Sequence, residues 1–140
     1  MSRQVWGIIP KIKEINQFLS VDMTAKSHIR ETHPEVCFWA LNGGEPMKYS
    51  KRGEKGFSER MQVLLSVCPC TGDVVDYALG KYPSSKVARN DILDALIAAV
   101  TASAERRGLS SIPKTIEVDS KGQSMEIVYY RVSKTIYPGS

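Results

Sequence analysis

The clearest pattern of hydrophobic and polar positions lies near the middle of the second half of the chain. Asn90 is a favourable residue at a helix start, and Gly108 can leave a helix with a positive φ. Arg106 and Arg107 would complement the negative end of the helix dipole. The apolar positions recur at helical spacing along one face: Ile92, Leu93, Leu96, Ile97 and Val100. We therefore predict a helix over Asn90–Gly108 that packs one stripe against a core.

A second helical pattern occupies Gln4–Leu19, where isoleucines alternate with lysines at helical spacing. Pro10 falls inside this pattern. It either starts the helix proper or kinks it, because proline has no N–H and crowds the preceding turn. Trp6 belongs either to the core or to a surface that binds a partner.

The next segment joins a predicted strand to a predicted helix. Lys26–Glu31 alternates weakly between polar and apolar residues, which favours a short strand. Pro34 suits the first turn of a helix, and Asn42-Gly43-Gly44 would end it. Glu31 and His33 therefore lie where a strand ends and a helix begins, a place where open α/β sheets carry their sites. His33 either bonds the Pro34 turn or acts as a general base.

The remaining elements are helices followed by a β-hairpin. Cys68-Pro69-Cys70 separates two helices, and a metal site there would need a second ligand cluster that the sequence does not offer. The predicted elements are helices over Ser58–Val67 and Asp73–Lys81, a linker at Ile112-Pro113, and hairpin strands over Thr115–Val118 and Met125–Tyr130.

Length and composition predict a single domain over residues 1–140, because 140 residues can bury a sizeable core. The net charge of +4 is compatible with a nucleic acid or another polyanionic partner but does not require one. No apolar run is long enough for a membrane span, and we expect no signal peptide. Three cysteines cannot form a closed set of disulfides, which favours a reducing, cytoplasmic location.

Two acids stand out in the predicted 90–108 helix. Asp91 and Asp94 are three residues apart and project on one side, close enough to share a cation. Alternatively, Asp91 only stabilises the positive end of the helix dipole.

The segment Glu45–Phe57 is polar and rich in basic residues. It is either a mobile lid that contacts phosphates or a solvated loop. The basic side chains that could contact phosphate are Lys48, Lys51, Arg52 and Lys55.

Three pieces of this chain together resemble the family called domain of unknown function 429, whose members are described as predicted nucleases with a ribonuclease H-like fold. The resemblance covers nearly the whole chain. Its pieces are Val5–Glu14 (VWGIIPKIKE), Glu31–Gly44 (ETHPEVCFWALNGG), and Asn90–Leu96 (NDILDAL) with Met125–Tyr129 downstream.

The resemblance implies a site as well as a fold. Ribonuclease H-like nucleases hydrolyse phosphodiesters with divalent metal ions, Mg²⁺ or Mn²⁺, held by carboxylates. By likeness to Holliday-junction resolvases of that superfamily, Glu31 corresponds to a strand-end acid, and Asp91 and Asp94 to the acids of the closing helix. These three residues are therefore the predicted catalytic and metal-binding residues. By residue type alone, Glu31 could equally be a surface acid, and Glu35 is only a favourable first-turn acid.

The resemblance also implies that this chain matches the C-terminal part of the family. Members open with an aspartate on a first β-strand, and we expect a truncated ribonuclease H-like α/β fold that lacks those first strands. A strand ending at Glu31 would then expose an apolar edge. Self-association, a separate chain, or pairing with the hairpin would cover it, and we expect a homodimer.

Two functions follow from this expectation. The first is a non-catalytic binding or structural module derived from a nuclease. The second is a metal-dependent nuclease completed by oligomerisation or by a second chain.

Overall fold

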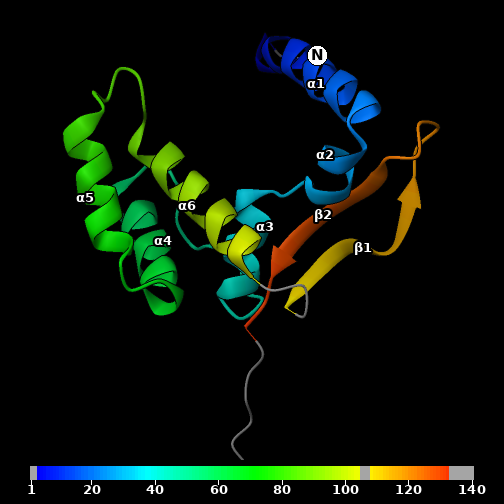
Figure 1. The fold of residues 1–140 in the computed structure, drawn as a ribbon. Coiled ribbons are helices and arrows are strands. Elements are labelled where there is room, and N and C mark those ends of the chain that lie inside the picture. The colour runs from blue at the N-terminus through cyan, green and yellow to red at the C-terminus, as the bar shows by residue number, and fades with distance from the viewer. Residues whose placement is uncertain (1–2, 105–107, 133–140) are drawn as a thin grey trace, which may run out of the picture.

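Six helices precede a two-stranded antiparallel sheet in the part of the chain that the computed structural model describes, residues 3–104 and 108–132 (Figure 1). This confirms the predicted helix-rich α/β fold with a C-terminal hairpin. The elements are α1 (Arg3–Val21), α2 (Met23–His28), α3 (Pro34–Leu41), α4 (Glu54–Val67), α5 (Thr71–Lys81), α6 (Arg89–Ser103), β1 (Leu109–Val118) and β2 (Ser124–Tyr130).

The hydrophobic core lies between α3, α4, α5, α6 and β2. The apolar stripe of α6 enters this core, as its spacing predicted, and Leu93 and Ile97 are fully buried. Trp39 and Tyr129 meet edge to face, which joins α3 to β2. The buried core residues are Cys37, Phe38, Ala40, Leu64, Val75, Ile92, Leu93, Ile97 and Tyr129. None of the α1 side chains that the structure describes, from Trp6 onward, is among them.

The bounds of α6 differ from the prediction at both ends. Ala88, not Asn90, is the N-cap, because the Asp91 carboxylate accepts a hydrogen bond from the Ala88 backbone N–H. The helix ends at Ser103, five residues before Gly108. The predicted roles of Arg106 and Arg107 fall outside the described residues.

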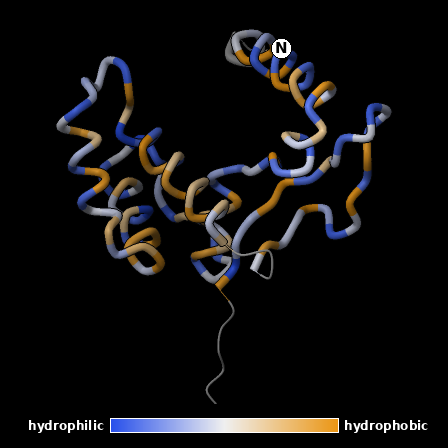
Figure 2. The backbone as a smooth tube through the Cα atoms, in the orientation of Figure 1, coloured by the Kyte–Doolittle hydropathy of each residue, from blue (hydrophilic) through white to orange (hydrophobic). Residues whose placement is uncertain are grey.

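The N-terminal helix is confirmed and stands away from the core. It runs from Arg3 to Val21 with Pro10 inside it, and the element it packs against most is α2. Hydrophobic positions recur along it (Figure 2). Trp6 is 64% exposed, so its assignment to the core is wrong, and a partner surface is the alternative that remains.

The predicted strand over Lys26–Glu31 is wrong, because Lys26–His28 belong to α2 and the bridge to β2 forms one residue beyond the predicted range. Asp22 caps α2 by accepting a hydrogen bond from the Ala25 N–H at 2.8 Å, and this helix continues to His28. Only Thr32 forms a bridge, in parallel with Val128 of β2.

Of the other helices, α3 begins as predicted, whereas α4 and α5 begin slightly earlier. The α3 helix begins at Pro34 and ends before Gly43 and Gly44, which both have positive φ, as the sequence indicated. Glu54 rather than Ser58 begins α4, and Thr71 rather than Asp73 begins α5.

The strands of the hairpin are longer than the strands predicted from the sequence. Ile112-Pro113 lies inside β1 instead of forming a linker, and the ladder is irregular between Ile112 and Glu117. The turn is as predicted, because Gly122 has a positive φ and donates its N–H to the Asp119 carbonyl.

Candidate functional site

Glu31 lies in the extended segment that joins α2 to α3, beside the middle of β2. Its carbonyl accepts a hydrogen bond from the Val128 N–H at 2.8 Å, and the Thr32 hydroxyl donates to the Val128 carbonyl at 2.7 Å. These bonds fix the backbone at Glu31 just before α3 begins. The hairpin therefore covers this segment on one side, which is one of the three arrangements expected for its edge.

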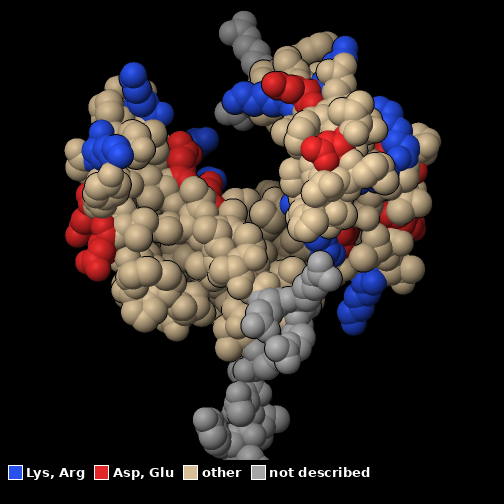
Figure 3. All heavy atoms as spheres, in the orientation of Figure 1, with Lys and Arg blue, Asp and Glu red and all other residues tan. Residues whose placement is uncertain are grey.

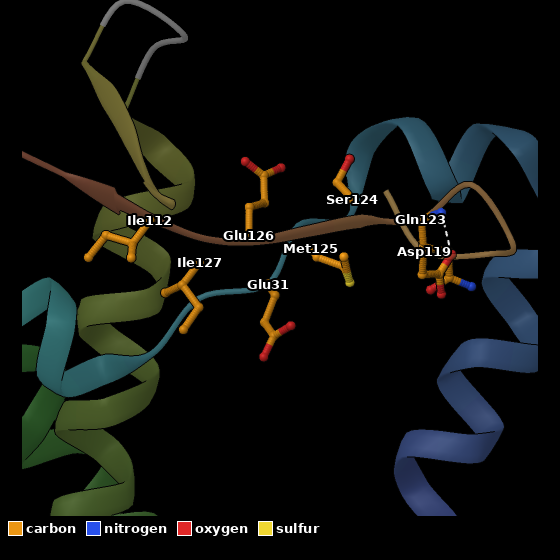
Figure 4. Close-up of a pocket in the computed structure, with 8 residues that line it drawn as sticks. All are labelled: Glu31, Ile112, Asp119, Gln123, Ser124, Met125, Glu126 and Ile127. Carbon is orange, nitrogen blue, oxygen red and sulfur yellow. Dashed lines mark hydrogen bonds between the residues drawn. The ribbon is translucent and has the colours of Figure 1, made fainter. Parts of the chain in front are cut away.

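The side chain of Glu31 is exposed and lines a pocket of about 420 Å³ along the hairpin. In the close-up, the Glu31 carboxylate points away from that of Glu126, which extends from the opposite side of β2 (Figure 4). Glu126 is buried, and it forms a bidentate ion pair with Arg30, with Nε–Oε1 and Nη2–Oε2 distances of 2.9 and 2.5 Å. Glu31 is thus the acid of this region that faces solvent.

Asp91 and Asp94 are directed to different partners. Asp91 is exposed, and its Oδ2 accepts from the Ala88 N–H at 3.3 Å, which is the helix-start role considered for it. Asp94 Oδ2 lies 3.0 Å from Lys51 Nζ. Asp94 Oδ1 and Asn90 Oδ1 are buried and have no hydrogen-bond partner among the described residues. Three acceptor-bearing side chains thus occupy the first two turns of α6.

The three predicted metal ligands do not come together in one chain. Glu31 lines the hairpin pocket, whereas Asp91 and Asp94 bond Ala88 and Lys51 on the other side of the core. Among the described residues, no three His, Cys, Asp or Glu side chains are grouped so that they could hold a metal ion. The geometry within one chain therefore does not fit a complete Mg²⁺ or Mn²⁺ site, and the catalytic role of each acid stays a prediction.

The basic segment Glu45–Phe57 is held to the helices at several points. The Glu59 carboxylate accepts from the Lys48 and Tyr49 backbone N–H groups at 2.9 and 3.1 Å. The buried Arg60 donates to the Tyr49 carbonyl at 3.1 Å. These bonds favour a fixed loop over a mobile lid.

Two of the basic side chains of that segment contact other groups of the chain. Lys51 is paired with Asp94, and Lys55 lies over the Tyr49 ring, 5.6 Å from its centroid. Contact of Lys48, Lys51, Arg52 and Lys55 with phosphate stays a prediction.

Sequence reasoning missed the two pairs that bury a charged group. Arg60 is only 3% exposed and makes two-pronged hydrogen bonds to Glu35, with Nη2 2.7 Å from Oε2. Glu35 is therefore more than a first-turn acid of α3. A glutamate within the apolar run Met125–Tyr130 was the available signal for the Arg30–Glu126 pair, since a buried acid requires a partner. Nothing local in the sequence indicated the burial of Arg60.

The sequence of this chain matches the model of one protein family. The model of the family described as "protein of unknown function (DUF429)" matches residues 1–118, which is most of the chain. The chain belongs to DUF429. The match covers the helical segments on which the resemblance depended and ends at Val118, so the Met125–Tyr129 segment lies beyond it. No curated protein and no solved structure matches the chain. Among the described residues, no helix is both long and apolar enough to span a membrane.

A hollow of about 1270 Å³ in this DUF429 chain lies between α1, α2 and the hairpin. We call it the α1 groove. Figure 3 shows a hollow between the region of α1 and that of α5 and α6, whereas the residues that line the α1 groove come from α1, α2, the hairpin and the C-terminal end of α6. The residues that line the α1 groove include Ile8, Ile12, Ile15, Lys26, Glu31 and Glu126.

Proposed function

We propose that this DUF429 chain is a non-catalytic binding module that self-associates through α1. The main support for this proposal is that the apolar wall of the α1 groove is exposed to solvent. Ile8, Ile12 and Ile15 are 51%, 52% and 52% exposed although all three line the groove. Apolar side chains on one stripe of a helix normally face a core, because removing them from water is favourable. No element in the described part of the chain covers this stripe.

The apolar wall of the α1 groove is itself a stripe along a helix. The stripe at positions 8, 12 and 15 has the spacing by which two helices pack along their length. We therefore infer that the occupant is helical.

A second copy of this chain is the occupant that the groove fits best. In a two-fold dimer the same surface must be complementary to itself. The α1 stripe meets this condition, because an antiparallel partner α1 would place isoleucine on isoleucine. The groove also carries both signs of charge, Lys26 and Glu31, so a second copy offers each of these two an opposite charge. The dimer first expected through a sheet edge is thus proposed through α1 instead.

The test is the molar mass of the purified chain, measured by light scattering over a series of concentrations. We expect a dimer that dissociates on dilution. Ile12→Asp should raise the dimer dissociation constant by about tenfold or more, because a buried carboxylate without a partner costs more than 1.4 kcal/mol. Val21→Asp is the matched control: Val21 is 82% exposed on the same helix but does not line the α1 groove.

A mass that stays monomeric at every concentration would refute this function. If Ile12→Asp and Val21→Asp weakened the dimer equally, the isoleucine stripe would not be the dimer interface, since only Ile12 lines the groove. Circular dichroism of both variants establishes that α1 is still helical when the masses are compared.

A metal-dependent phosphodiester hydrolase, completed by oligomerisation or by a second chain, is the second candidate. It is supported by the buried, unbonded Oδ1 atoms of Asn90 and Asp94, one helical turn apart. The resemblance to ribonuclease H-like predicted nucleases, and to their C-terminal part, also favours it. Because the acids of one chain do not form a complete site, ligands from elsewhere would have to join Asp94, and we derive no hydrolytic step here.

Manganese titration separates the two candidates. If α6 retains a cation site, added Mn²⁺ raises the melting temperature by mass action. Asp94→Asn should abolish that rise, while Asp76→Asn on the exposed side of α5 should keep it. No shift at millimolar Mn²⁺ would leave the binding module as the function.

A further inference from the structure

The turn between α4 and α5 brings two free thiols together. Cys68 is the C-cap of α4 and Cys70 is the N-cap of α5, with Pro69 between them. Their Sγ atoms are 3.3 Å apart and share a hydrogen bond. The third cysteine, Cys37, is fully buried in the core, so it serves as an unreactive reference in the same molecule.

We propose that Cys68 and Cys70 form a thiol–disulfide exchange site that takes small-molecule disulfides as its oxidant. The function proposed for α1 does not involve this turn. A zinc site here would need further ligands, and no group of three or more metal-binding side chains is found among the described residues. Two thiols are sufficient for exchange, one to attack and one to resolve the intermediate.

The backbone of this turn is held on both sides, which keeps the thiols close. The Cys68 N–H donates to the Leu64 carbonyl at 2.8 Å, and the Val74 N–H donates to the Cys70 carbonyl at 3.2 Å. Thr71 is fully buried and donates twice to the Cys68 carbonyl, from its N–H at 3.0 Å and its hydroxyl at 2.6 Å. Pro69 has a restricted φ. Little conformational freedom is left to lose when the thiols react together.

The two thiols are not equivalent. The hydrogen bond from Cys70 holds the pKa of Cys68 below its ordinary value, with a smaller contribution from the Thr71 side chain. The same hydrogen bond and the charge of Cys68 raise the pKa of Cys70, and Asp73 adds to the rise. Cys68 therefore supplies more thiolate at neutral pH and is the attacking group, since the thiolate is the nucleophile. Cys70 is the resolving group.

The exchange balances with glutathione disulfide as the oxidant. The Cys68 thiolate attacks one sulfur, the glutathione S–S bond breaks, and a Cys68–glutathione disulfide forms as one glutathione thiolate leaves. Cys70 loses its proton and attacks the Cys68 sulfur, which releases the second glutathione thiolate. The product is a Cys68–Cys70 disulfide, and the two cysteine protons end on two molecules of reduced glutathione.

The experiment equilibrates the full chain with oxidised and reduced glutathione in the presence of EDTA, traps free thiols with N-ethylmaleimide, and maps the peptides by mass spectrometry. We expect an internal Cys68–Cys70 disulfide, lighter than the reduced peptide by two hydrogens. Cys37 should react with the maleimide only after unfolding. Glutathione attached to both cysteines without an internal disulfide, or disulfide-linked dimers alone, would overturn the proposal.

Two variants assign the roles. Cys70→Ser should accumulate a stable Cys68–glutathione adduct, because the resolving thiol is gone. Cys68→Ser should react severalfold more slowly at pH 7, because only the thiol with the raised pKa remains. Equal reaction rates in the two variants would contradict the assignment of Cys68 as the attacking group. Unchanged far-ultraviolet circular dichroism in each variant ensures that the rates compare folded chains.

Discussion

The ammonium group of Lys51 lies 3.0 Å from the Asp94 carboxylate oxygen Oδ2. A basic residue predicted to contact phosphate is therefore the ion-pair partner of an acid predicted to bind metal. The pair links the loop before α4 to the second turn of α6, and both side chains are partly exposed. A metal ion at Asp94 would compete with Lys51 for the same carboxylate.

Replacing Lys51 tests what this pair contributes. Lys51→Met should lower the free energy of unfolding by about 0.5–1 kcal/mol, the upper range for a partly exposed ion pair. The loss should disappear in a background that already carries Asp94→Asn, because the partner charge is absent there. Urea unfolding of the four chains of this double-mutant cycle measures the coupling. Equal losses in both backgrounds would mean that the two charges do not interact.

Lys51→Met also bears on metal binding. If Asp94 accepts a cation, removal of the competing ammonium should strengthen the Mn²⁺-induced rise in melting temperature. A weaker rise than in the unmodified chain would show that Lys51 assists the site instead of competing with it.

The Arg60–Glu35 pair should cost more to break than the exposed Arg89–Glu54 pair. Arg60 is buried, and Glu35 accepts from both its Nε and its Nη2. Glu35→Ala should cost about 3 kcal/mol, because it leaves a buried guanidinium without its counter-ion. The Arg89–Glu54 pair is the control: Glu54 is 79% exposed, so Glu54→Ala should cost less than about 1 kcal/mol.

The midpoints of urea unfolding provide this comparison. Similar losses for Glu35→Ala and Glu54→Ala would contradict the structural role assigned to Arg60. Its position explains the expected difference, because it joins α4 to α3 through Glu35 and to the preceding loop through the Tyr49 carbonyl.

The sequence was sufficient for elements whose signals are local. The stripe of α6 and the Gly43-Gly44 stop of α3 depend on residues a few positions apart, and both were predicted correctly. The strand predicted over Lys26–Glu31 was wrong because the periodicity of only six residues cannot distinguish a helix from a strand. The Asp22 side chain stabilises a helix there by capping the start of α2.

Side-chain partners could not be predicted in the same way. Asp91 and Asp94 do lie in neighbouring turns of α6, but the partner of Asp94 is 43 residues away in the chain. Arg60 and Glu35 are 25 residues apart on different helices. Such contacts depend on how the helices pack against one another. The spacing of acids within one helix therefore predicts which side of the helix they face, but it does not predict their hydrogen-bond or ion-pair partners.

Gly56 is the glycine with the least room for a side chain. A Cβ built on it would lie 2.0 Å from the Ser50 carbonyl oxygen, which belongs to the backbone and cannot move aside cheaply. Gly56→Ala should therefore cost at least about 2 kcal/mol. Gly80→Ala, in the last turn of α5 with nothing within 4 Å, should stabilise the chain by about 0.5–1 kcal/mol. Thermal unfolding of both variants tests this, and destabilisation of equal size at the two sites would contradict it.

The hairpin turn should depend on the charge of Asp119. Hydrogen bonds from the Gln123 and Lys121 N–H groups, both at 2.8 Å, hold the pKa of Asp119 below its ordinary value of 3.8. A group with a lowered pKa in the folded state adds stability above its unfolded pKa, and this addition is lost as the pH falls through the folded pKa. Asp119→Asn should therefore unfold at lower urea than the unmodified chain at pH 6, and the gap should close as the pH is lowered below 3.8.

Asp119→Ala separates the charge from the hydrogen bonds. Asparagine keeps an oxygen that can accept from both N–H groups, whereas alanine leaves them without their acceptor. The alanine variant should therefore remain less stable than the unmodified chain even at the acid end of the series. If the gap between Asp119→Asn and the unmodified chain were the same at every pH, the carboxylate charge would have no part in holding the turn.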